Sequence, residues 1–170
     1  MLAPASSVLD VACGTGRHLQ WFVQAGHAVL GIDRDVSGAR HLASQVTLLQ
    51  ADIENAPWPL LTAGCPRQFD AVVVTNYLWR PLLPTLLASI APGGMLLYET
   101  FSIGNAAYGR PRRADFLLQS GELLDVCKGL DIVAYENGVL DNPLRCVQRI
   151  VAKRPRLDAS NDTPAMGHAL

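Results

Sequence analysis

Two glycines near the N-terminus stand where a ligand-binding turn would be built. The segment from Leu9 to His18 reads LDVACGTGRH, and it places Gly14 and Gly16 between an apolar run and a helix-like segment. Glycines there permit tight backbone dihedrals and a close approach to a ligand, and free N–H groups at a helix start favour negative charge. A plain tight turn is the alternative. The dinucleotide pattern needs a third glycine three residues after the second, where this chain has Leu19, which argues against NAD.

Two carboxylates follow at the ends of the next apolar runs. Asp33 ends the second run, about 20 residues past the glycines, where an acid can accept hydrogen bonds from both hydroxyls of a ribose. Asp35 is better read as a helix cap. Asp52 ends the third run and can accept from an exocyclic amine, and its neighbour Ile53 can flank a purine. A turn cap is an equal alternative for Asp52 alone, but three such sites in succession favour a nucleoside-type ligand.

A loop in the second half of the chain concentrates positive charge. Arg110, Arg112 and Arg113 fall within four positions, shortly after Tyr108. A guanidinium can grip a carboxylate or oxyanion through its planar fork. We therefore predict that Tyr108, Arg110 and Arg112 bind an anionic small substrate. A solvated loop is the alternative.

The candidate catalytic residues follow the fourth and fifth apolar runs. Asn76 and Tyr77 come after the fourth run, and Glu99 lies near the end of the fifth, where its carboxylate could act as a base. Two other reactive side chains receive structural interpretations. We expect Cys13 to be a small core residue and His18 to lie on a helix surface.

The elements that must position these residues alternate between strand and helix. Alternation of this kind predicts right-handed βαβ units and a parallel sheet. The five strand-like runs are Val8 to Val11, Ala28 to Ile32, Val46 to Leu49, Phe69 to Thr75 and Met95 to Tyr98. The helical candidates are Gly16 to Ala25, Val36 to Ser44, Leu82 to Ala91 and Asp115 to Gly129.

The last two strand-like runs break this alternation. Ile132 to Leu140 and Arg145 to Lys153 are separated only by Asp141-Asn142-Pro143. Three turn-forming residues cannot house a crossover helix, so this pair is predicted to be an antiparallel hairpin.

Composition limits the function classes. With 170 residues, the chain has the length of one domain, since domains hold roughly 150 residues. A net charge of −1 argues against a broad phosphate-binding surface and hence against nucleic acid. No stretch approaches the ~18 apolar residues of a membrane span. The four cysteines, Cys13, Cys65, Cys127 and Cys146, form no CxxC pair and have no histidine at metal-ligand spacing, which predicts a reduced, cytoplasmic protein without a metal.

Several motifs together resemble those of the class I S-adenosylmethionine-dependent methyltransferases. They are VLDVACGTGRH, GIDRD, LQADI, FDAVVVTNYL and the APGG turn that opens MLLYETF. The resemblance runs from Ser7 to Lys153, and small bacterial members, including the tellurite-resistance-like group, have similar loops. It implies an α/β fold, a three-layer Rossmann-like arrangement around a seven-stranded, mostly parallel sheet. The implied strand order is 3-2-1-4-5-7-6 with strand 7 antiparallel, in agreement with the predicted hairpin.

The resemblance also assigns residues to parts of an S-adenosyl-L-methionine cofactor. It implies that Asp10, Gly14 and Gly16 line the methionyl part, that Asp33 holds the ribose, that Asp52 and Ile53 contact the adenine, and that Thr75 and Asn76 lie near the sulfonium. The implied activity is methyl transfer to a small, anionic molecule by in-line displacement. Two alternatives are a non-catalytic binding module or partner subunit, and an NAD-type oxidoreductase, which Leu19 disfavours.

The domain organisation follows from the same assignment. We expect a single methyltransferase domain over residues 1–154, without the N-terminal lid helices of many relatives, and a flexible tail over 155–170. A lid would then come from a homo-oligomer or another partner. The segment Asn76-Tyr77 lacks the prolines of the D/N-P-P-Y/F motif of base-modifying relatives, which favours a small-molecule substrate over nucleic acid.

Overall fold

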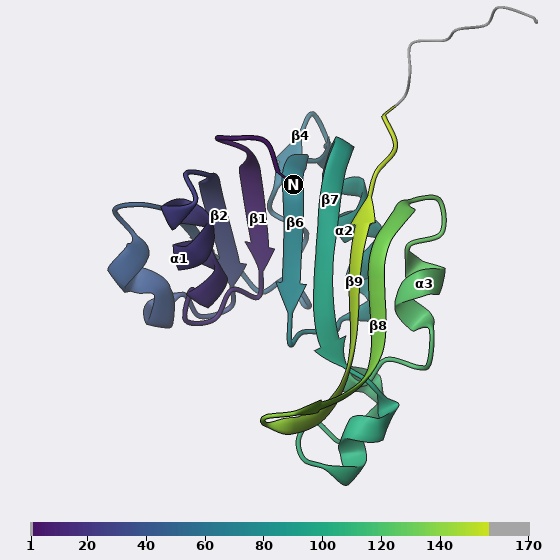
Figure 1. Cartoon of the computed structure of the whole chain (residues 1–170). Helices are drawn as coiled ribbons and strands as arrows, with labels where there is room; N and C mark the ends of the chain where they lie inside the picture. The colour runs from purple at the N-terminus through teal and green to yellow at the C-terminus, as the bar shows by residue number, and fades with distance from the viewer. Residues whose placement is uncertain (1, 157–170) are drawn as a thin grey trace, which may run out of the picture.

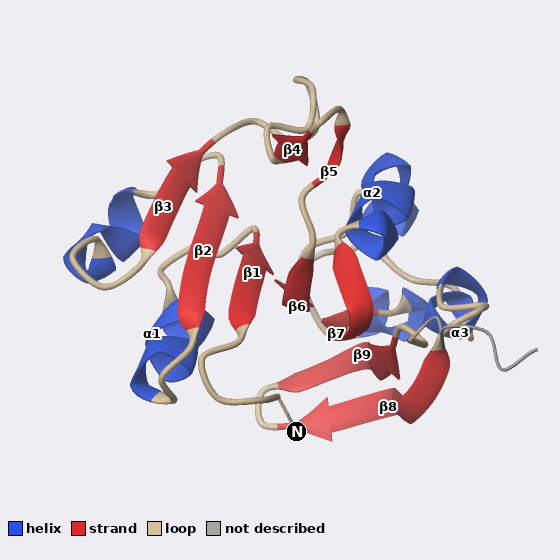
Figure 2. Cartoon of the chain, turned by 90° about the horizontal axis from the view of Figure 1, so that it is seen from above, coloured by secondary structure: helices blue, strands red, loops and turns tan. Residues whose placement is uncertain are grey.

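A seven-stranded sheet forms the centre of the computed structural model, which describes residues 2–156. The order is β3-β2-β1-β6-β7-β9-β8 (Figure 1, with β3 labelled in Figure 2). Every strand pairs in parallel with its neighbour except β9, which is antiparallel to both β7 and β8. The predicted fold class, strand order and terminal hairpin are confirmed. The strands are β1 (Ser7–Val11), β2 (Ala28–Asp33), β3 (Thr47–Gln50), β6 (Phe69–Thr75), β7 (Ile90–Phe101), β8 (Asp131–Asp141) and β9 (Leu144–Lys153).

The helices are shorter than the sequence pattern indicates (Figure 2). Only α1 (Arg17–Gln24) matches its predicted range closely. The segment after β2 forms the 3-10 helix η1 (Ser37–Leu42) rather than an α-helix. After the short 3-10 helix η2 (Arg80–Leu82), α2 (Leu83–Ala88) stops before Ile90, because Ile90 already pairs with β6.

The predicted helix over 115–129 is in fact two separate pieces. They are the 3-10 helix η4 (Ala114–Phe116) and α3 (Glu122–Val126). Between them Leu118 is fully buried and extended, and its N–H donates to the Phe101 carbonyl at the end of β7. This pairing takes the backbone out of the helical conformation, so the helix cannot run through.

A small hairpin connects β3 to β6 in place of a crossover helix (Figure 2). Its strands are β4 (Leu61–Thr62) and β5 (Cys65–Pro66). The two turn residues, Ala63 and Gly64, both have positive φ, as the commonest tight hairpin turn requires. The sequence pattern did not predict this element.

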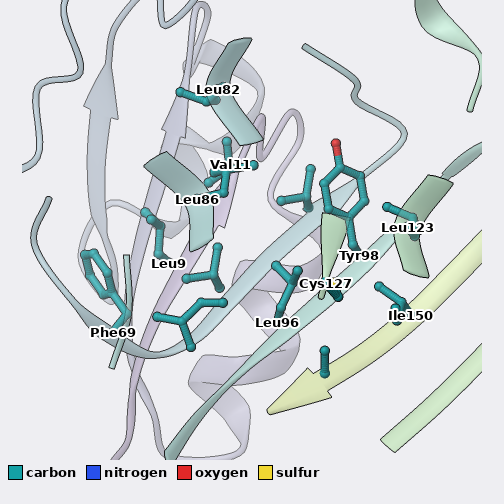
Figure 3. Packing of buried hydrophobic residues seen from close by; sticks show 14 of the residues in the cluster. Leu9, Val11, Phe69, Leu82, Leu86, Leu96, Tyr98, Leu123, Cys127 and Ile150 are labelled. Carbon is teal, nitrogen blue, oxygen red and sulfur yellow. The ribbon is translucent and has the colours of Figure 1, made fainter. Parts of the chain in front are cut away.

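The two faces of the sheet are covered unequally. On one face α2, η2 and α3 bury side chains of β1, β7 and β9, including Leu9, Leu96, Tyr98 and Ile150 (Figure 3). On the other, the α1 face, Leu19 and Phe22 of α1 pack against Val8 and Val73. In β7 the residues that alternate with Leu96 and Tyr98, such as Leu97, are only half-buried. The α1 face is therefore well covered over β1 and more open over β7 and β9.

Two further predictions concern the C-terminal tail and membrane-spanning segments. The tail predicted to be flexible lies outside the described residues from position 157 onward. Within residues 2–156, no helix combines the length and apolar character needed to cross a membrane.

Candidate active site

The turn between β1 and α1 uses its two glycines differently. Both adopt positive φ, 53° at Gly14 and 83° at Gly16. A Cβ on Gly16 would lie 2.8 Å from Leu42 and 3.2 Å from Ala39, so packing against η1 requires glycine there. A Cβ on Gly14 would meet no described atom within 4 Å. Gly14 therefore borders open space in which a ligand can approach the backbone.

Two residues other than glycine share this left-handed conformation at neighbouring strand ends. Ala12 follows β1 with φ 56°, and Asn76 follows β6 with φ 55°. Asparagine tolerates this region, whereas for alanine the Cβ makes it strained. Strained backbone of this kind clusters at functional sites. The sequence motifs did not identify Ala12 as a candidate site residue. Its position between a buried strand and a glycine turn is nevertheless one where a left-handed backbone conformation can be expected.

Asp33 ties the glycine turn to the end of β2. Its Oδ2 accepts a hydrogen bond from the Gly14 N–H at 2.9 Å, and its Oδ1 accepts one from the Asp35 N–H at 2.9 Å. Each oxygen of a carboxylate can accept two hydrogen bonds, so each keeps one site for a ligand. Asp33 thus lies where the sequence predicted, with capacity to bind a diol.

Asp33 lines a cavity of about 260 Å³, here called the acidic cavity. Asp52 is also part of its wall, but its carboxylate caps a turn by accepting from the Glu54 N–H and from the backbone and side chain of Asn55. These bonds, led by the one from the Asn55 side chain, lower the pKa of Asp52. The cap interpretation describes its present contacts, and its adenine contact remains a prediction. The full lining is Ala12, Asp33, Arg34, Asp52, Ile53, Glu54 and Tyr77.

Asp10 is a buried carboxylate without a hydrogen-bond partner among the described residues. It lies on β1 beneath the glycine turn, and neither oxygen has a hydrogen-bond partner among residues 2–156. Burial raises its pKa to about 7, the negative charge of Asp33 adds to the rise, and Arg17 opposes it. An unsatisfied buried carboxylate is costly, so its presence indicates a ligand that supplies donors or positive charge.

The end of β6 meets α1 through a side-chain contact. His18 Nδ1 lies 3.3 Å from Thr75 Oγ1, and partial burial lowers the pKa of His18. His18 is therefore a partly buried imidazole beside the strand end, not simply a helix-surface residue as its sequence position suggested. The next residue, Asn76, donates its backbone N–H to the Glu99 carbonyl at 2.9 Å. Thr75, Asn76 and Glu99 are thereby brought together.

Glu99 forms ion pairs with two arginines of β9. Its Oε2 lies 2.6 Å from Arg149 Nε, and its Oε1 lies 3.7 Å from Arg145 Nη2. Arg149 also contacts Glu136 of β8 at 3.2 Å. These contacts hold the Glu99 side chain in place. They favour a positioning role for Glu99, and its action as a base remains a prediction.

A second cavity, of about 290 Å³, contains three arginines and is called here the arginine cavity. Arg110 comes from the loop after η3 (Ile103–Ala107), as the sequence predicted, but Arg17 of α1 and Arg145 of β9 were not anticipated. Asn76, Glu99 and Asn105 complete its polar wall. The signal for Arg17 and Arg145 exists only in three dimensions, because the three arginines lie far apart in the sequence.

Tyr108 and Arg112 are exposed and do not line the arginine cavity. Their roles in substrate binding stay predictions. Tyr77, by contrast, lines the acidic cavity, and burial raises the pKa of its hydroxyl. Among residues 2–156 there is no cluster of three or more His, Cys, Asp or Glu side chains able to hold a metal ion.

A comparison with protein families assigns the chain. Residues 8–94, from β1 into β7, match the family model described as "Methyltransferase domain". The chain belongs to this methyltransferase family. The prediction of a methyltransferase is thereby confirmed, and the matched range contains the glycine turn, Asp33, Asp52 and the segment after β6. A search of curated proteins finds no match to the sequence.

Solved structures of methyltransferases share the fold. The structure of TehB from Haemophilus influenzae is 19% identical with a TM-score of 0.70, over 89% of this chain and 58% of that protein. An S-adenosylmethionine-dependent methyltransferase from Mesorhizobium loti is 18% identical with a TM-score of 0.70, over 91% and 93%. A Burkholderia thailandensis N1-methyltransferase with bound S-adenosylhomocysteine is 15% identical with a TM-score of 0.64, over 89% and 72%. The chain therefore spans little more than half the length of TehB.

The site residues fit the cofactor expected for this methyltransferase, S-adenosylmethionine. Asp33 has free acceptor sites for ribose hydroxyls, Gly14 leaves open space above the turn, and Asp10 lacks a partner for its buried charge. A carboxylate in that position complements a ligand that carries an ammonium and a sulfonium.

Proposed function

We propose that this chain transfers a methyl group from S-adenosylmethionine to a small anionic molecule by in-line displacement. The carrying observation is that three consecutive residues, the last of β6 and the two that follow it, border three different cavities. Tyr77 lines the acidic cavity and Asn76 lines the arginine cavity. Thr75 lines a third cavity on the α1 face. A cofactor in the acidic cavity and an acceptor in the arginine cavity would thus meet at this segment.

The acidic cavity supplies the cofactor contacts in this proposal. Asp33 would hold the ribose, Ile53 would flank the adenine, and the backbone at Gly14 would approach the methionyl part. Asp10 would supply negative charge beneath the turn, where the ligand is positive. These roles follow from acceptor capacity and position.

The arginine cavity supplies the acceptor contacts. Arg17, Arg110 and Arg145 provide three positive charges, while Glu99 provides one negative charge that is already paired with Arg149. The surplus of positive charge favours an anion. This charge balance is the reason for proposing an anionic acceptor.

The chemistry asks mainly for alignment. The sulfonium of the cofactor supplies an activated methyl group, so the chain has to orient the acceptor and exclude water. Asp33 and the Gly14 turn would hold the cofactor so that its methyl group passes to a lone pair of the acceptor, and the electron pair of the sulfur–carbon bond would stay with sulfur. Where the acceptor atom carries a proton, His18, whose Nδ1 lies 3.3 Å from Thr75 Oγ1, would be placed to receive it from an acceptor held beside Thr75.

Ligand-dependent thermal unfolding tests the cofactor assignment. A ligand at 100 times its dissociation constant adds about 2.7 kcal/mol to the free energy of unfolding. We expect this stabilisation from S-adenosylmethionine and S-adenosylhomocysteine, and none from NAD. Stabilisation by NAD alone would overturn the assignment. Turnover is then measured with a panel of carboxylic acids and their neutral amides, and cofactor binding without any turnover would favour a non-catalytic binding module.

Two broader features belong to the same proposal. The four cysteines are free, and three of them are buried, which fits a reduced, cytoplasmic location. We also propose that residues 1–154 act as one methyltransferase domain, with no nucleic-acid or membrane partner.

A further inference from the structure

A third cavity, of about 320 Å³, lies on the open part of the α1 face and is called here the apolar cavity. Its walls include Trp21 of α1 and the cross-strand pair Leu97 and Val151 of β7 and β9. Trp21 is 62% exposed and packs edge-on against Phe22, with ring centroids 4.8 Å apart. A large exposed aromatic side chain beside half-buried aliphatic ones forms a surface suited to a ring or a hydrocarbon chain.

The apolar cavity and the arginine cavity share one residue, Glu99. In the register of β7 with β9, the pair Glu99 and Arg149 lies two residues beyond the pair Leu97 and Val151. Because side chains two residues apart in a strand point to the same face, both pairs lie on the α1 face. Toward the carboxyl end of β7, this face therefore changes from apolar to ionic.

Arg145 keeps unused capacity to bind an anion. It is 3.7 Å from Glu99, a loose contact compared with the 2.6 Å between Glu99 and Arg149. Its Nε, like that of Arg149, is buried and has no hydrogen-bond partner among residues 2–156, but only Arg145 lines the arginine cavity. A buried guanidinium N–H without a partner is costly, so an oxyanion placed there would satisfy it.

We propose that the acceptor is an amphipathic monoanion, with a carboxylate or similar oxyanion attached to an aromatic or aliphatic body. The anionic group binds Arg145 in the arginine cavity, the body lies against Trp21, Leu97 and Val151, and the atom to be methylated lies between them beside Thr75 and Asn76. This inference rests on the proposed function and adds the apolar half of the acceptor.

Binding of simple probes to the protein saturated with S-adenosylhomocysteine tests the inference. The probes are benzoate, acetate and benzamide, titrated in protein-observed NMR with the Trp21 indole as reporter. Benzoate has both halves, acetate only the anion, and benzamide only the ring. We expect benzoate to bind about tenfold more tightly than either of the others, since a buried ring edge or an ion pair each contributes about 1.4 kcal/mol.

Variants separate the two halves of the acceptor. Arg145→Gln is expected to weaken benzoate and acetate equally, by about tenfold. Arg67→Gln, an exposed arginine over Phe69, is the matched control and leaves both unchanged. Trp21→Ala, followed through other shifted resonances, is expected to weaken benzoate by about fivefold and to leave acetate unchanged. Phe116→Ala, which removes an exposed aromatic outside these cavities, is its control.

The outcomes distinguish this inference from the function on which it rests. Failure to bind S-adenosylhomocysteine overturns the proposed function. If the cofactor product binds but acetate matches benzoate, the apolar half is wrong and the anionic acceptor stands. Equal binding of benzamide and benzoate overturns the anionic half, and no measurable benzoate binding to the loaded protein overturns the inference as a whole.

Discussion

The two halves of the sheet hold their sites in different ways. In the half formed by β1, β2 and β3, the site is made of backbone turns and of carboxylates that bond to them, as Asp33 does with Gly14. In the half formed by β7, β9 and β8, the site is made of long side chains, as Glu99, Arg145 and Arg149 show. The first half is closed by α1 and η1, and the second remains open on the α1 face. A cofactor common to a family is thus met by backbone geometry, and a variable acceptor by exchangeable side chains.

The buried carboxylate of Asp10 gives the largest expected effect on the first half. Its pKa of about 7 in the folded protein is above the ordinary value of 3.8, so the folded state holds this proton more tightly than the unfolded state does. The free energy of unfolding of the ligand-free protein therefore falls as pH rises between these two values and is level above about pH 7. The asparagine of Asp10→Asn does not titrate, so the free energy of unfolding of this variant, taken relative to that of the parent protein, should rise by about 3 kcal/mol between about pH 5 and about pH 8.

Chemical denaturation of both proteins across this pH range measures the effect. The matched control is Asp70→Asn, because backbone and hydroxyl bonds from Ser7 lower the pKa of Asp70 instead. A constant difference between Asp10→Asn and the parent at all pH values would show that Asp10 is not protonated in the folded state.

Asp33 should have the next largest effect, again confined to the first half. Asp33→Ala removes the proposed ribose contacts and one support of the glycine turn, so affinity for S-adenosylhomocysteine should fall by about 1–3 kcal/mol. Isothermal titration calorimetry measures it. Asp35→Ala serves as the control, since that carboxylate accepts from Ser37 and does not line the acidic cavity. Unchanged affinity in Asp33→Ala would remove the ribose role.

A substitution at Arg80 tests the second half of the sheet. It pairs with Glu122 at 2.7 Å and donates to the carbonyls of Asp115 and Leu117, so it anchors the segment that follows the Arg110 loop. Because the side chain is partly exposed, Arg80→Gln should lower the free energy of unfolding by only about 1–2 kcal/mol. The affinity for S-adenosylhomocysteine should stay constant while the acceptor KM rises. A loss of cofactor affinity of the same size would show that the two halves are not independent.

Ala12 gives the smallest expected effect and tests strain in the first half. Ala12→Gly should relieve its left-handed backbone and raise the free energy of unfolding by about 1 kcal/mol. Ala63→Gly, in the β4–β5 turn with φ 51°, is the matched control and should stabilise by a similar amount. Only Ala12→Gly should change cofactor affinity, because only Ala12 lines the acidic cavity. Equal cofactor affinity in the two variants would mean that strain at Ala12 has no part in binding.

The sequence predicted the parts of the site that are formed by residues close together in the chain. The range predicted for β6 agrees with the structure, and Gly14 and Asp33 were placed correctly because each is marked by its position after an apolar run. Helix lengths were overestimated, since periodicity cannot reveal that Leu118 adds to the end of β7. The arginine cavity could not be predicted, because Arg17 and Arg145 meet only through the order of strands in the sheet.

Arg17 occupies a position with kinetic consequences. It is the first residue of α1, directly after Gly16, and it also lines the arginine cavity. A ligand that orders the glycine turn would therefore also order Arg17, which is bonded directly to Gly16. In a steady-state experiment we expect an ordered mechanism, in which the methyl donor binds first and its demethylated product leaves last.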